Sequence, residues 1–136
     1  MATATQPQSN LLRNALRGNS IFSAMSGLIT AIGAGVLVQF MDVGSVALYL
    51  VVGIALIIHA VMLYLNTRTD RINVGFAWYA IIGDVLWVLA TAFILLTDSF
   101  NLSSEGKWLL LFIGDIVLLF AIAQFWGLRR MNRSQQ

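Results

Sequence analysis

Residues 46–65, VALYLVVGIALIIHAVMLYL, decide the fold. The stretch is twenty residues long, and His59 is its only member that is not apolar, aromatic or Gly. A helix of this length is about 30 Å long, which matches the hydrocarbon core of a bilayer. Inside lipid the backbone N–H and C=O groups must be satisfied within the segment, so such a run is a helix. We therefore predict that residues 46–65 cross a membrane.

Three further runs of the same kind flank this one, at residues 21–41, 75–96 and 108–126. Of the 136 residues, 59% are hydrophobic and 10% charged, whereas soluble domains carry about 25% charged residues. The short connections make consecutive helices antiparallel neighbours. We predict an all-α integral membrane protein, a four-helix antiparallel transmembrane bundle within residues 10–130. The polar segments 1–9 and 131–136 should be tails, the first of them disordered.

The basic residues indicate the topology. Seven of the eight precede the first run, lie between the second and third, or follow the fourth; they are Arg13, Arg17, Arg68, Arg71, Arg129, Arg130 and Arg133. Only Lys107 lies on the other side. By the positive-inside rule, both termini are expected in the cytoplasm and the protein in the inner (plasma) membrane. The basic balance follows from topology and does not indicate nucleic acid.

Two of the apolar runs contain the same pair, Gly83-Asp84 and Gly114-Asp115. A carboxyl group inside a membrane is costly and needs a partner, a proton or a role. From the helical rise, His59 and Asp84 should lie about 10 and 14 Å from the cytoplasmic surface, and Asp115 about 10 Å from the outer one. Thr30 should lie near the depth of Asp84, and Thr91 shares its helix face.

Two interpretations of these residues stay open. In the first, His59, Asp84 and Asp115 turn inward and satisfy one another, which fixes which helix faces meet. In the second they form a proton or cation relay, because chains of Asp and His carry protons through membranes and His titrates near neutral pH.

Small and hydroxylated residues fall on one face of the first run. They are Ser23, Ser26, Gly27, Thr30 and Ala34, at helical spacing. Small side chains let helices approach closely and hydroxyls bond between helices, so we interpret this face as a packing seam. The alternative is that its hydroxyls line a polar path.

The sequence offers little for catalysis. There is no Cys, one His, and no zinc, phosphate-loop or serine-nucleophile motif. We expect no enzyme activity, no metal site and no cofactor. Haem would need a second axial ligand, which Met62 cannot supply from the helix of His59, so only two His59 side chains across a dimer could hold it.

Three segments carry a family resemblance. The stretch NSIFSAMSG at residues 19–27, GDVLWVLA at residues 83–90 and the ending Leu128-Arg129-Arg130 resemble a group of small bacterial four-span membrane proteins. The group is uncharacterised, so the resemblance implies a topology and a bacterial membrane but no activity. Small multidrug exporters also have four short helices, but they rely on a Glu in the first helix, and this first run has no acid.

Three functions follow as hypotheses. The leading one is a non-enzymatic multi-pass membrane protein that acts through helix packing, as a homo-oligomer or as an accessory subunit of a larger membrane complex in the lipid bilayer. The second is a proton-coupled small-solute carrier or channel that uses His59, Asp84 and Asp115. The third is a haem- or quinone-binding membrane subunit.

Overall fold

The computed structural model describes residues 7–133. Its elements are α1 (Pro7–Ile32), α2 (Ala34–Met41), α3 (Val46–Arg68), α4 (Val74–Thr97) and α5 (Ser104–Arg133), and no strand occurs among the described residues. The all-α prediction is confirmed. Of the predicted tails, residues 1–6 and 134–136 lie outside the described range. The prediction is wrong for residues 7–9, which begin α1, and for residues 131–133, which continue α5.

Three or four segments could cross a membrane. Helices α3, α4 and α5 are each long and apolar enough, and α1 with α2 qualifies as one broken span, bent by 87°. The protein is therefore a multi-pass membrane protein. The continuous helix predicted at residues 21–41 is wrong, because α1 ends at Ile32 and the chain turns at Gly33 before α2 begins.

The bend lies at a glycine, the residue at which sharp helix kinks commonly occur. The amide of Gly33 donates to Ile29 O at 2.8 Å, and the amide of Leu37 donates to Gly33 O at 2.9 Å, so the backbone stays hydrogen-bonded through the turn. A Cβ at Gly33 would lie 2.7 Å from the Ile29 carbonyl oxygen. The local geometry therefore requires glycine at this position.

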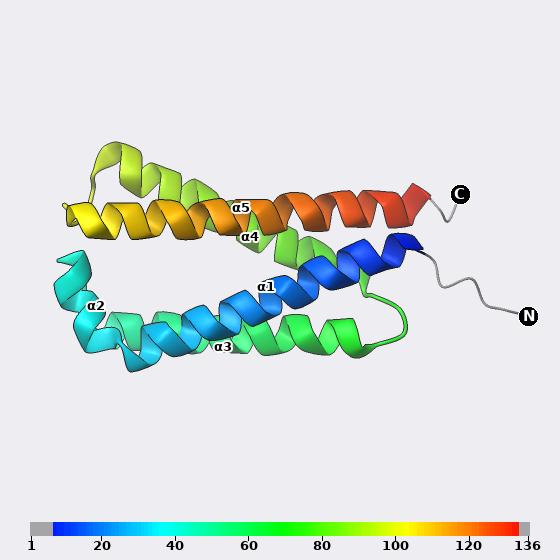
Figure 1. Ribbon diagram of the computed structural model, residues 1–136, viewed down its shortest axis with the longest axis horizontal. Coiled ribbons are helices and arrows are strands. Elements are labelled where there is room, and N and C mark those ends of the chain that lie inside the picture. The colour runs from blue at the N-terminus through cyan, green and yellow to red at the C-terminus, as the bar shows by residue number, and fades with distance from the viewer. Residues whose placement is uncertain (1–6, 134–136) are drawn as a thin grey trace, which may run out of the picture.

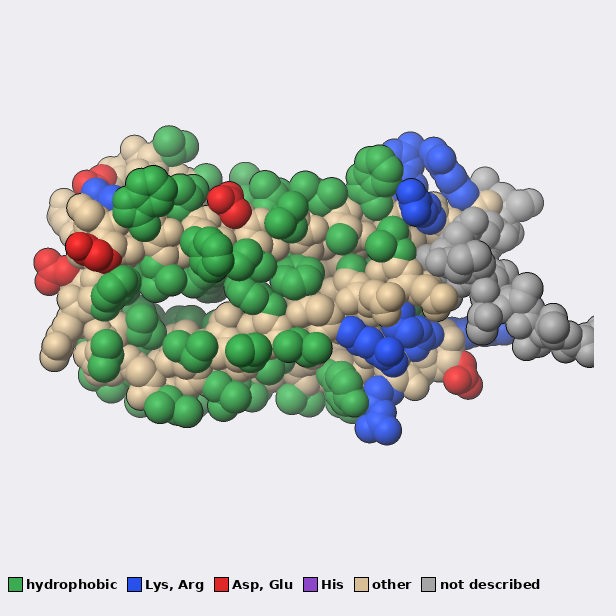
Figure 2. All heavy atoms as spheres, viewed as in Figure 1, with side chains coloured by type: hydrophobic (Ala, Val, Ile, Leu, Met, Phe, Trp, Pro, Cys, Tyr) green, Lys and Arg blue, Asp and Glu red, His purple; other side chains and the backbone are tan. Residues whose placement is uncertain are grey.

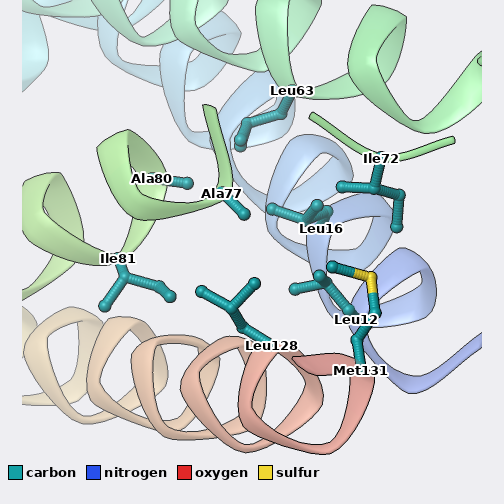
Figure 3. Close-up of a cluster of buried hydrophobic side chains, with 9 residues drawn as sticks. All are labelled: Leu12, Leu16, Leu63, Ile72, Ala77, Ala80, Ile81, Leu128 and Met131. Atoms are coloured by element: carbon teal, nitrogen blue, oxygen red, sulfur yellow. The ribbon is translucent and has the colours of Figure 1, made fainter. Parts of the chain in front are cut away.

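The helices pack as two pairs, α1 with α3 and α4 with α5, and α1 also packs against α5 (Figure 1). At the end where both termini lie, side chains from all four long helices and the α3–α4 loop form one hydrophobic cluster (Figure 3). Its members are Leu12, Leu16, Leu63, Ile72, Ala77, Ala80, Ile81, Leu128 and Met131. This cluster joins the two pairs at that end.

Glycines set the closest helix approaches. A Cβ at Gly53 of α3 would lie 2.7 Å from both Ala31 N and Gly27 O of α1, and one at Gly127 of α5 would lie 2.8 Å from Leu12 Cα of α1. Backbones this close leave no room for any side chain. Gly27, predicted for a packing seam, therefore contributes to the α1–α3 contact.

The opposite end is crossed by α2, which leads from the α1–α3 pair toward α5 (Figure 1). The amide of Ser103 donates to Met41 O at 3.2 Å, and Gly106 of α5 packs beside Met41. Most basic side chains gather at the end with the termini (Figure 2). The α2 helix thus ties the two pairs together where the hydrophobic cluster does not reach.

Candidate functional site: a carboxyl group in an intramembrane cavity

Asp84 is held by amide side chains from two other helices. Asn19 Nδ2 of α1 donates to Asp84 Oδ2 at 2.8 Å, and Gln124 Nε2 of α5 donates to the same oxygen at 2.9 Å. Ser23 Oγ donates in turn to Asn19 Oδ1 at 3.2 Å. Asp84 is 6% exposed and Gln124 is fully buried. The network links α1, α4 and α5 in the interior of the bundle.

Next to this network lies a cavity of about 270 Å³. Residues of all five helices line it, with Leu37 and Met41 of α2 among them. Figure 2 shows the hollow between the α1–α3 and α4–α5 pairs, on the half of the molecule away from the basic end. Most of the lining is apolar; its polar members are Asn19, Ser23, Ser26, Thr30, Tyr49, His59, Tyr79 and Asp84. Asp84 therefore borders an apolar space inside the membrane.

His59 lines the same cavity but bonds elsewhere. Its Nδ1 lies 3.3 Å from the Tyr79 hydroxyl, and the two rings are 5.7 Å apart between centroids. His59 is half-buried on α3 and Tyr79 is on α4, so the pair joins two helices that follow each other in the chain. The structure gives His59 no hydrogen bond to either acid.

Asp115 and Thr91 lie away from the cavity. The Asp115 side chain is exposed on the outer face of α5 and accepts no hydrogen bond from a described residue. Thr91 is buried, with its methyl group facing Gly114 of α5. Of the five proposed relay residues, the structure brings together His59, Asp84 and Thr30 but not the other two.

The residues of the packing seam predicted on the first run do not all contact the same neighbours. Ser23 joins the Asp84 network, Ser26 lines the cavity, and Gly27 packs on α3. Ala34 is buried, but it lies beyond the bend, in α2. The regular spacing therefore did not produce one continuous face.

Sequence reasoning missed both partners of Asp84. Gln124 is an uncharged amide inside the run 108–126, and its presence among apolar residues was the available signal. The first apolar run begins at residue 21, so the predicted span does not include Asn19. Since α1 begins at Pro7, Asn19 lies in the middle of a helix and reaches the interior.

The described residues contain no cluster of three or more His, Cys, Asp or Glu side chains that could hold a metal ion. A scan against protein-family models and searches of curated proteins and of solved structures found no match. The resemblance based on residues 19–27 and 83–90 therefore stays a prediction.

Proposed function

We propose that this chain is a non-enzymatic multi-pass protein of the inner membrane that works as an assembly, in which α5 of one copy packs on α5 of a second. Both termini lie in the cytoplasm in this proposal, because the basic side chains gather at that end (Figure 2). The observation that carries the proposal is the exposed carboxyl group of Asp115 on a membrane-spanning helix.

Asp115 lies well inside the expected hydrocarbon layer. Trp108 and Trp126, both exposed, stand toward the two ends of the apolar part of α5, where aromatic side chains anchor a span. Asp115 is seven residues from the first and eleven from the second, about 10 and 16 Å along the helix. In an isolated copy this carboxyl group would face lipid tails, which is costly, so a covering partner is expected.

A second copy is the partner that this surface fits. The neighbours of Asp115 on its exposed face are large apolar side chains, with Phe112 and Leu119 one turn away on either side. In a two-fold symmetric pair of parallel copies, each carboxyl group meets its own equivalent at the same depth. Two carboxyl groups can then hydrogen-bond if one or both are protonated.

The relay hypothesis has less support from this geometry. A relay through His59, Asp84 and Asp115 needs the three groups along one path, and Asp115 faces away from the cavity that the other two line. We therefore do not propose proton-coupled transport through these three residues.

Cysteine cross-linking tests the assembly directly, because the chain contains no Cys. Leu119→Cys on α5 and Leu89→Cys on α4 are matched probes, with the native side chains 66% and 60% exposed. In liposomes at low protein density, oxidation should yield a disulfide-linked dimer with Leu119→Cys and little with Leu89→Cys. Adding Asp115→Leu should reduce the α5 cross-link, whereas Asp115→Asn should retain it.

Equal cross-linking at both positions would indicate random collision and contradict the proposal. No cross-link at Leu119→Cys in liposomes would also contradict it. A cross-link from Leu119→Cys to a different protein in native membranes would then assign the chain as an accessory subunit.

A further inference from the structure

We propose that the cavity beside Asp84 binds a small lipophilic organic cation, such as a protonated amine that carries an apolar group. This inference is independent of the α5 surface. It rests on the carboxyl group, on the lack of a cation beside it, and on the aromatic side chains around the hollow.

The Asp84 carboxyl group has one oxygen in use and one free. Both hydrogen bonds that it accepts, from Asn19 and Gln124, end on Oδ2. Oδ1 accepts none from the described residues, although Asp84 borders the cavity. The arrangement thus presents a fixed acceptor to whatever enters the cavity.

No side chain around the cavity supplies a matching cation. Its lining contains neither Lys nor Arg, and its single His59 is engaged with Tyr79. The only ion pair between described side chains, Lys107 with Asp98, lies in the α4–α5 connection and at the start of α5. A buried acidic group without a protein counter-ion favours a cationic ligand that donates a hydrogen bond.

Aromatic rings complete the site. Phe22, Tyr49, Tyr79 and Trp87 contribute to the lining from α1, α3 and α4. The faces of such rings attract organic cations, and the attraction grows when water is excluded. Apolar lining with one or two fixed polar groups is the usual composition of a small-molecule site.

Size and position restrict the ligand further. A volume of about 270 Å³ is close to the lower end of ligand pockets, roughly 300–1,000 Å³. The hollow lies between the two helix pairs and within the expected thickness of the membrane (Figure 2). A small molecule that partitions into lipid can therefore reach it from the side, with its charged group toward Asp84.

The test uses 4-phenylbutylamine and its neutral analogue 4-phenylbutanol as probes of the full chain in lipid nanodiscs, with empty nanodiscs as the partitioning control. The NMR shift of the Trp87 indole N–H, assigned with Trp87→Phe, reports occupancy of the cavity. The amine should shift this signal saturably, with a Kd at least tenfold lower than that of the alcohol.

Two variants with the same substitution separate the site from general charge effects. Asp84→Asn should raise the Kd for the amine at least tenfold, whereas Asp115→Asn, on the exposed face of α5, should leave it unchanged.

Gly83→Leu tests the cavity by filling it, without changing the hydrogen bonds of Asp84. Gly83 lines the cavity, and a Cβ there has no heavy atom within 4 Å, so the added side chain can occupy the space and should block binding.

The proposal would be overturned if the amine bound no better than the alcohol. It would also be overturned if the amine bound equally well to Gly83→Leu and to the wild type. Loss of the α5 cross-link with amine binding retained would contradict only the proposed assembly, so the two failures are distinguishable.

Discussion

Gly53→Ala should destabilise the bundle although it adds a single methyl group. The added Cβ would lie 2.7 Å from both Ala31 N and Gly27 O, which are backbone atoms of α1. Ordinary contact begins at 3.4 Å, so the two helices must separate by about 0.7 Å at this point. Backbone atoms cannot rotate away as a side chain can.

The cost follows from that separation. A gap of 0.5–1 Å removes about a quarter to a half of the dispersion energy of each atom pair that it separates. Overpacking of this kind typically costs about 1–3 kcal/mol. Gly83→Ala is the matched control, because a Cβ there meets no atom within 4 Å and any gain in helix propensity applies to both variants. Its expected effect is within about 0.5 kcal/mol.

Reversible unfolding in mixed micelles, with the free energy measured as the SDS fraction is varied, provides the assay. Gly53→Ala should unfold at a lower SDS fraction than Gly83→Ala by the equivalent of about 1–3 kcal/mol. If the two variants unfolded together, the close α1–α3 approach would be contradicted.

Three other substitutions test other parts of the structure. Asn19→Ala removes one of the two donors to Asp84 and should cost about 0.6 kcal/mol, with about 1.7 as the upper bound for such bonds, in the same unfolding assay. Gly127→Ala places a Cβ 2.8 Å from Leu12 Cα and should cost about 1–3 kcal/mol, measured in the same way. Arg13 donates to one carbonyl oxygen in the last turn of α3 and to two just after it, so Arg13→Gln should speed amide hydrogen exchange in residues 69–73 with the α1–α3 packing unchanged.

The helices themselves were predictable because their signal is long and local. A run of about twenty apolar residues must form a helix in lipid, because its backbone groups have to be hydrogen-bonded within the segment. The spans predicted at residues 46–65 and 75–96 therefore agree with α3 and α4 to within a few residues. The bend at Gly33 was not predictable in this way. A membrane helix tolerates glycine, and the turned arrangement depends on contacts of α2 with α3 and with the start of α5, which the local sequence does not reveal.

The two Gly-Asp pairs show that the same local sequence can place an acid in different surroundings. In the packing interpretation both acids turn inward, whereas in the structure Asp84 is buried and Asp115 is exposed. The buried positions on α5 include Gly114, Val117, Ala121, Gln124 and Leu128, at spacings of three and four. Asp115 follows Gly114 by one residue, about 100° around the helix, and so points away from that stripe. On α4, by contrast, Asp84 lies on the buried stripe that includes Ala77 and Ala80. The position of each acid relative to the buried stripe of its helix, rather than the shared dipeptide, therefore separates Asp84 from Asp115.

The bend and the cavity have a common origin. Had α1 continued straight to Met41, it would have lain along α3 for the whole span. Instead it ends at Ile32, and α2 crosses the end of the bundle, where Met41 O accepts from the amide of Ser103. The hydrophobic cluster joins the two pairs at the opposite end (Figure 3), and the cavity lies between the cluster and α2. Asp84 lies between the cluster and this space, where its partners fix one oxygen and leave the other accessible. The free oxygen beside the cavity is the feature that interhelical packing does not use, and the proposed ligand site rests on it.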